Sequence, residues 1–218
     1  MKIRLLLLGC ALLALGACSE TRFESPPGDA IESCDARWKG LWVDASADAA
    51  SAEEDELAFL VDPECRLHMI ERPEKDGPPK LIHVPVNFVH DGDNDYLVIA
   101  DNQLAGIVEL DAVHGIDPAP AKSFFLARYR IDGDRLAISG IDSRKTAHLV
   151  VDNVLDGTID RRKNELHVYV RGDPAAILDI LRTQDLFESK PGAEVRRVPL
   201  SLEEYEKRRS ASRKSREP

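Results

Sequence analysis

The sequence predicts a mainly β protein: an antiparallel β-barrel or sandwich of about nine or ten strands with a short C-terminal helical appendage. Between residues 34 and 172, apolar and polar residues alternate over short segments, as they do in half-buried strands. Turns rich in Gly, Pro, Asp and Asn separate these segments. Turn signals this close together favour a sandwich or barrel over βαβ units.

Two tight turns and one proline support the strand assignment. Asp62-Pro63-Glu64-Cys65 and Asp132-Gly133-Asp134 each lie between two alternating segments, so each predicts a β-hairpin. Pro85 interrupts the segment 81–90 and has no N–H for a ladder, which predicts an edge strand or a bulged one. The predicted strands are residues 37–43, 57–61, 66–70, 81–90, 96–100, 104–110, 124–131, 135–141, 146–151 and 166–170.

The pattern becomes helical after residue 172. Asp173 and Pro174 have the residue types that start a helix, and apolar residues at helical spacing follow them. Ser201 and Glu204 fit a capping box at the start of a second helix. The last residues, 210–218, are basic and Ser-rich, and we expect them to be a disordered tail.

Composition limits the class of protein. The chain has 218 residues, of which 43% are hydrophobic and 31% charged, and its formal net charge is −10. The apolar share is too high for a disordered chain, and charges are too frequent for many membrane spans. A protein that coats nucleic acid needs a basic surface, so the acidity argues against a nucleic-acid partner.

The N-terminus has the pattern of an export signal. Lys2 and Arg4 precede roughly ten apolar residues, which is too few to span a bilayer. The stretch closes with Leu15-Gly16-Ala17-Cys18, which resembles the signal of bacterial lipoproteins. The resemblance implies that Cys18 receives a diacylglyceryl group, that the chain is cut before it, and that the new amine is acylated. An ordinary cleaved signal with an incidental Cys18 is the alternative.

This resemblance also implies an organisation for the whole chain. The expected parts are a signal peptide over residues 1–17, a lipidated tether over 18–33, a β domain over 34–172, a helical appendage over 173–209 and a basic tail over 210–218. With Ser19 after the cysteine, a lipoprotein of a Gram-negative source is expected on the outer membrane, facing the periplasm. Loss of Lys2 and Arg4 with the signal changes the net charge by two, from −10 to −12.

Two cysteines remain for the mature domain, Cys34 and Cys65. An exported chain folds in an oxidising compartment, which predicts a disulfide between them. Free buried thiols, and a catalytic or metal-binding pair, are the alternatives. His68 is close to Cys65 in sequence, but an odd separation places the two on opposite faces of a strand.

Gly40-Leu41-Trp42 resembles the Gly-x-Trp motif near the first strand of lipocalin-like (calycin) barrels. In that family the Trp closes the barrel floor and a basic residue near the last strand packs over it, a position for which Arg171 is the candidate here. The resemblance implies a cup for a small apolar ligand. A plain aromatic core is the alternative explanation of these residues.

No recognisable catalytic or metal motif is present, so we predict that the protein is not an enzyme and holds no cofactor. Residues 91–95 resemble the start of a calcium loop, but Tyr96 stands where Gly should bend the chain and Asn102 where a bidentate Glu is needed. They are better interpreted as an acidic hairpin turn. The histidines lack metal-binding spacing; they are His68, His83, His90, His114, His148 and His167.

The expected function is therefore binding: a membrane-anchored interaction module, either an envelope maintenance factor or an inhibitor of a wall- or lipid-degrading toxin. Its expected partners are the bilayer, through acylated Cys18, and an unknown protein. A lipocalin-like carrier of a small apolar ligand is the alternative, and an envelope hydrolase with a dispersed site is the second. A basic C-terminal cluster could contact an anionic surface; its members are Lys207, Arg208, Arg209, Arg213, Lys214 and Arg216.

Overall fold

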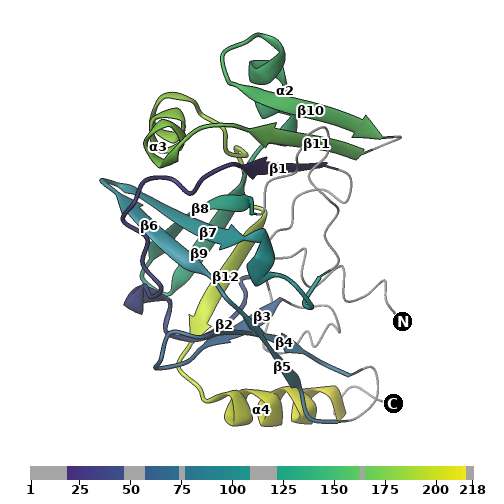
Figure 1. Cartoon of the computed structure of the whole chain (residues 1–218). Helices are drawn as coiled ribbons and strands as arrows, with labels where there is room; N and C mark the ends of the chain where they lie inside the picture. Colours follow the sequence, from purple (N-terminus) through teal and green to yellow (C-terminus); the bar gives the residue numbers. More distant parts are fainter. Residues whose placement is uncertain (1–18, 47–56, 74–76, 109–121, 163–164, 215–218) are drawn as a thin grey trace.

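The computed structural model describes residues 19–46, 57–73, 77–108, 122–162 and 165–214 (Figure 1). Within these ranges the protein is mainly β, as the sequence predicts, and its strands belong to one sheet of twelve. The helical elements are η1 (Ala36–Trp38), η2 (Asp101–Gln103), α2 (Ser143–Val151), α3 (Pro174–Thr183) and α4 (Leu202–Lys214).

Nine antiparallel strands curve into an incomplete barrel. Their order along the sheet is β5-β4-β3-β2-β12-β9-β8-β7-β6. β5 and β6 follow each other in the chain, yet they lie at the two ends of this row and are not paired with each other. Pro85 and Val86 separate them, so the single edge or bulged strand predicted over 81–90 is instead two strands at the two ends of the row. The strands are β2 (Gly40–Asp44), β3 (Ala58–Val61), β4 (Leu67–Glu71), β5 (Lys80–Val84), β6 (Asn87–Asp91), β7 (Asn94–Ala100), β8 (Phe124–Asp132), β9 (Arg135–Gly140) and β12 (Ala193–Val198).

The remaining three strands form a side layer. β1 (Ser19–Phe23) pairs in parallel with β11 (Glu165–Val170), and β11 pairs antiparallel with β10 (Gly157–Arg162). β1 joins this layer to the barrel because Phe23 pairs with Phe124 at the start of β8. The sheet is therefore mixed rather than purely antiparallel.

Side chains fill the inside of the incomplete barrel. One buried cluster takes residues from all nine barrel strands and centres on the aromatic rings of Trp38, Trp42, Phe59 and Phe88. A second cluster lies between the sheet and the helices α2 and α3. A third lies on the outer face of β2, β3 and β4 beneath α4, where Tyr205 packs.

Local sequence signals place most of these elements. Gly133 (φ 61°) makes the predicted β8–β9 turn. Asp142 caps α2 and Asp173 caps α3 by accepting hydrogen bonds from backbone N–H groups of the first turn. The predicted capping box of α4 is confirmed, since Ser201 and Glu204 bond reciprocally.

The predicted tether is wrong in its first part. Residues 19–23 form β1, and Phe23 is completely buried. The following residues also bind the body of the protein: the Gly28 N–H bonds the Pro174 carbonyl at 2.8 Å, and Glu32 pairs with Phe88 of β6. Because the partners of this segment come from distant parts of the chain, its local sequence gives no sign of the pairing.

Three other predicted elements need correction. Residues 146–151 belong to helix α2 and not to a strand, because the Asp142 cap starts a helix that the β-branched residues do not prevent. The expected strand 104–110 is reduced to a bridge between Ala105 and Val108, and its last two residues lie outside the described ones. The expected helical appendage 173–209 contains β12, which lies between β9 and β2 in the incomplete barrel, and α4 extends through residues 210–214 of the expected tail.

Candidate functional site

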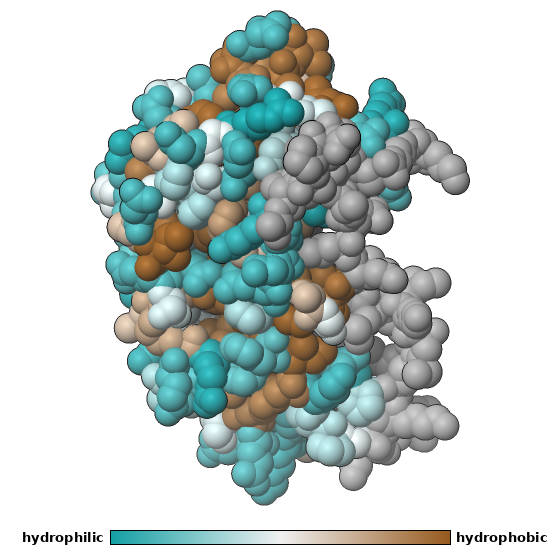
Figure 2. Space-filling model, viewed as in Figure 1, coloured by the Kyte–Doolittle hydropathy of each residue, from teal (hydrophilic) through white to brown (hydrophobic). Residues whose placement is uncertain are grey.

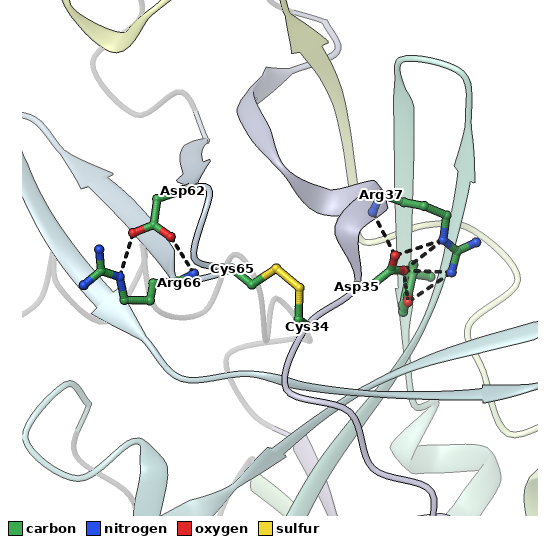
Figure 3. The surroundings of a disulfide bond; sticks show 7 residues. Cys34, Asp35, Arg37, Asp62, Cys65 and Arg66 are labelled. Carbon is green, nitrogen blue, oxygen red and sulfur yellow. Dashed lines mark hydrogen bonds and ion pairs between the residues drawn. A yellow bond between two sulfur atoms is a disulfide. The ribbon is translucent and has the colours of Figure 1, made fainter.

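A disulfide fixes the segment that begins the candidate site. Cys34 and Cys65 are bonded, with Cα atoms 5.4 Å apart, as the sequence predicts. Cys34 lies just before η1, and Cys65 lies in the turn between β3 and β4. Figure 3 shows an acid–arginine pair on each side of the bond. The bond therefore holds the start of η1 against the barrel.

Asp35 and Arg37 form a closed ion pair at the start of η1. The Asp35 carboxylate accepts a hydrogen bond from the backbone N–H of Arg37 at 2.9 Å. The guanidinium returns to the same carboxylate, with Nε 3.0 Å from Oδ1 and Nη2 2.7 Å from Oδ2. The Asp35 side chain is 5% exposed and that of Arg37 46%. A directional, charge-assisted pair thus has its carboxylate inside and its guanidinium at the surface.

Tyr129 of β8 satisfies the buried side of the same carboxylate. Its hydroxyl donates to Asp35 Oδ2 at 2.6 Å. Its ring meets Trp38 edge-on, with ring centroids 5.0 Å apart. Tyr129 therefore fixes the position of Asp35 from the side of the aromatic core, while Arg37 fixes it from the side of the surface.

The β6–β7 hairpin completes the network. His90 and Asp95 face each other across the two strands, and His90 Nδ1 lies 2.6 Å from Asp95 Oδ1. The other carboxylate oxygen of Asp95 lies 2.9 Å from Arg37 Nη2. We name the network of Asp35, Arg37, His90, Asp95 and Tyr129 the Arg37 cluster. It unites η1, the β6–β7 hairpin and β8.

The Arg37 cluster sets its own protonation states. Burial by itself raises the pKa of the Asp35 carboxyl, but hydrogen bonds from Arg37 and Tyr129 outweigh burial and hold this pKa below its usual value. Burial, and then the hydrogen bond to Asp35, raise the pKa of the Tyr129 phenol. Hydrogen bonds to Asp35 and Asp95 raise the pKa of the Arg37 guanidinium. At neutral pH the cluster contains a fixed carboxylate, a neutral phenol and a cation.

The cluster presents polar groups in fixed positions at the surface. Asp95 orients the His90 imidazole as an acid orients a catalytic base. In the described part of the chain, however, His90 Nδ1 lies next to the Asp95 carboxylate at 2.6 Å and the Arg37 guanidinium at 3.4 Å, and neither group is a nucleophile. No group of three or more metal-ligating side chains occurs among the described residues. At the surface the cluster presents a half-exposed guanidinium and an imidazole in fixed positions.

Arg197 and Trp42 also hold η1 in place, through its backbone. Arg197 of β12 lies over the Trp42 indole, with its guanidinium carbon 4.6 Å from the ring centroid, and it donates to the backbone carbonyl of Arg37. Trp42 Nε1 donates to the Trp38 carbonyl at 2.6 Å. Gly40 has a φ of 123°, and a Cβ there would lie 3.2 Å from the Arg197 side chain. Gly40 is needed both for its conformation and for the close approach of the arginine.

The structure corrects one sequence expectation at this point. The basic residue over Trp42 is Arg197, and not Arg171. Arg171 instead bonds Asp156 and Thr158 at the edge of the side layer, at 3.0 and 2.8 Å. The helical pattern after residue 172 hides the short strand β12 that carries Arg197.

Apart from His90 and Asp95, the other predicted site residues lie outside the Arg37 cluster. Asp91 to Asp95 form the β6–β7 hairpin turn, where Asp91 bonds Arg182 of α3 at 2.8 and 2.6 Å. Opposite each other on β4 and β5, His68 and His83 have ring centroids 5.4 Å apart. Cys18 and His114 lie outside the described residues.

Most of the Arg37 cluster escaped the sequence analysis. Asp35 and Arg37 directly follow Cys34, and an acid and an arginine two residues apart beside a structural cysteine were a usable signal. Asp95 and His90 were noticed only as possible metal ligands. Tyr129 lies in the predicted strand 124–131, and its partner Asp35 is distant in sequence, so no local pattern links the two.

No protein-family model matches this sequence, and neither the curated proteins nor the solved structures contain a match to it. In the part of the chain that the structure describes, no helix is both long enough and apolar enough to cross a membrane.

Proposed function

We propose that this protein is an exported lipoprotein, anchored through acylated Cys18 to the periplasmic face of an outer membrane, and that its β domain binds a protein of the cell envelope. The signal-like residues 1–17 and the Leu15-Gly16-Ala17-Cys18 sequence support the anchor. The Cys34–Cys65 disulfide supports an oxidising compartment.

The observation that supports binding is the rigidity of the Arg37 cluster at the surface. A disulfide, a buried carboxylate and an aromatic core fix the position of Arg37 before any partner arrives. Arginine and aromatic residues contribute strongly to protein interfaces, and preorganised side chains lose little entropy on binding. In Figure 1 the β6–β7 hairpin points to the left, whereas β1, which follows the anchor, begins at the right. This arrangement supports a partner that approaches from a side other than that of the anchor.

The charge of the cluster indicates the chemistry of the partner. The single guanidinium of Arg37 is shared by the carboxylates of Asp35 and Asp95, and the whole chain has a net charge of −10. A partner with a basic surface would complement the net negative charge of the chain, and a hydrogen-bond acceptor on that partner would meet the exposed guanidinium of Arg37. An envelope maintenance factor and a basic wall- or lipid-degrading toxin both fit that description.

Cross-linking from two matched positions tests this proposal. A photoreactive residue replaces Asp93 in the hairpin beside the cluster or Leu81 on the exposed strand β5, and each chain is expressed in cells with an intact signal. We expect one envelope protein to cross-link from position 93 but not from position 81, and to be lost when His90→Ala is added. Equal cross-linking from both positions, or none, counts against the proposal.

A carrier of a small apolar ligand is the second candidate, because Arg197 over Trp42 has the arrangement that the lipocalin-like resemblance implies. A carrier needs an open apolar interior, whereas side chains from all nine strands fill this one. We therefore rank it below surface binding. Native mass spectrometry of protein purified from membranes under mild conditions tests it: a bound lipid-sized mass that survives removal of the N-terminal anchor would favour the carrier.

A further inference from the structure

The position of β1 implies an orientation of the domain on its membrane, and this inference rests on the proposed lipid anchor. Ser19, the residue after Cys18, is already part of β1 and pairs with Leu166. All five residues of β1 pair with β11, and the last three are buried. One residue spans at most about 3.5 Å. The lipid would therefore attach at a fixed corner of the side layer and hold that layer close to the headgroups.

Helix α2 and the turn that follows it carry the most exposed large apolar side chains of the described residues. Val151, at the end of α2, is 66% exposed, and Val154 is 53% exposed. Figure 2 shows apolar surface gathered at the top of the molecule, over α2. A contiguous apolar patch on a surface can mark a contact with a protein or a membrane.

The two valines are held rigidly together. Asn153 between them has a left-handed φ of 57°, and its N–H bonds the Val150 carbonyl at 3.1 Å. The Val154 N–H bonds the Leu149 carbonyl at 2.9 Å. A left-handed residue with such bonds is a stable helix end. The short segment 151–154 is therefore a fixed tip rather than a frayed end.

The tip lies beside the Phe23 end of β1, at the opposite end of this strand from the anchored residue. α2 leads through this tip into β10, whose first residue, Gly157, pairs with Val170 of β11, which pairs with Phe23. Phe23 is four residues along β1 from Ser19, which is about 13 Å at the usual rise of a strand. One membrane surface can therefore contact both the lipidated residue and the tip.

We propose that Val151 and Val154 form a second, shallow membrane contact that orients the anchored domain. The occupant of this surface is the headgroup region of the bilayer that holds the Cys18 lipid. Without the signal the chain has a net charge of −12, which repels anionic headgroups, so the contact must be apolar rather than electrostatic. Asp152 and Asn153 are exposed beside the valines and limit the contact to the interface.

Fluorescence quenching tests the contact. Trp38 and Trp42 are completely buried, so a tryptophan introduced at the surface is the one that a lipid-borne quencher can reach. Val151→Trp and Val154→Trp are made in the full-length lipidated protein, and Leu81→Trp on β5 is the control, because Leu81 is 43% exposed on another part of the sheet. Each protein is placed in phosphatidylethanolamine–phosphatidylglycerol vesicles with a nitroxide near the lipid glycerol.

We expect at least twofold stronger quenching at positions 151 and 154 than at position 81, and a fall at position 151 when Val154→Asp is added. Flotation of the same vesicles reports the anchor separately. Proteins that float but show equal quenching at all three positions overturn the orientation and leave the anchor intact. A wild-type chain that does not float contradicts the proposed lipid anchor, and the orientation fails with it.

Discussion

Arg197 and Trp42 join the last strand of the barrel to its first, because the guanidinium carbon lies 4.6 Å from the centroid of the indole ring. Both residues also bond the backbone of η1: Arg197 donates to the Arg37 carbonyl and Trp42 to the Trp38 carbonyl. The contact therefore supports the Arg37 cluster as well as the barrel.

Arg197→Ala removes this contact and the bond to η1. We expect it to lower the free energy of unfolding by about 2 kcal/mol, the sum of a half-buried cation–π contact and a charged hydrogen bond. Urea denaturation followed by tryptophan fluorescence measures the change. Arg171→Ala is the matched control: it removes an exposed ion pair with Asp156, which is expected to cost less than about 1 kcal/mol. The reverse order would show that Arg197 does not support the barrel.

Gly40→Ala tests the close approach of Arg197. The substitution puts a Cβ 3.2 Å from the arginine side chain at a φ of 123°, and we expect it to cost more than about 1 kcal/mol. Gly133→Ala is the control, since Gly133 also has a positive φ but nothing within 4 Å of the added Cβ. If the clash is the cause, Gly40→Ala will be less harmful in an Arg197→Ala background. Additive losses in the double variant would contradict this explanation.

The parts of the fold that are local in sequence could be predicted. Turns at Asp62–Cys65 and Asp132–Asp134, and the helix starts at Asp173 and Ser201, depend on residues within a few positions of each other. The disulfide could be predicted because cleavage of the signal and acylation of Cys18 leave two cysteines, and an exported chain folds in an oxidising compartment. A turn or a helix start can be predicted because the residues that determine it are neighbours in the sequence.

Contacts between distant segments could not be predicted. Nothing local distinguishes Ser19–Phe23 from a tether, because its strand character depends on β11, far along the chain. Similarly, Asp35 becomes a buried carboxylate only because Tyr129 and Arg37 meet it. β12 was missed because a short strand between two helices was assigned to the helical appendage.

Asp35→Asn tests the electrostatics of the Arg37 cluster. The folded protein holds the Asp35 pKa below its usual value, so the charged carboxylate contributes stability above about pH 4, and this contribution is lost as pH falls through the folded pKa. We expect the variant to be less stable by about 2 kcal/mol at pH 7, because Arg37 and Tyr129 lose a charged acceptor.

The difference in unfolding free energy between wild type and Asp35→Asn should then shrink toward pH 3. Urea denaturation at several pH values between 3 and 7 measures it, with Asp93→Asn in the exposed hairpin turn as the control. A difference that stays constant with pH would mean that the Asp35 carboxylate is not stabilised by its partners.

Reduction of the Cys34–Cys65 disulfide should destabilise the fold. The bond closes a loop with a sequence separation of 31, which corresponds to about 3–4 kcal/mol in the chain-entropy model. Thermal unfolding with and without a phosphine reductant measures the loss, and the Cys34→Ser/Cys65→Ser double variant should match the reduced protein. An unchanged melting temperature would indicate that the native bond adds no stability.

Two variants separate the anchor from the strand that follows it. Phe23 is completely buried in the core beneath α2 and α3, so Phe23→Ala should lower the free energy of unfolding by about 3–4 kcal/mol while the protein still fractionates with membranes. Cys18→Ser removes the thiol that is proposed to be acylated, and it changes none of the contacts among the described residues. It should therefore leave the free energy of unfolding unchanged and release the protein from membranes. Denaturation of purified proteins and fractionation of cells give the two readouts. A Phe23→Ala protein of wild-type stability would restore a simple tether over residues 18–33, and a Cys18→Ser protein that stays with membranes would remove the lipid anchor.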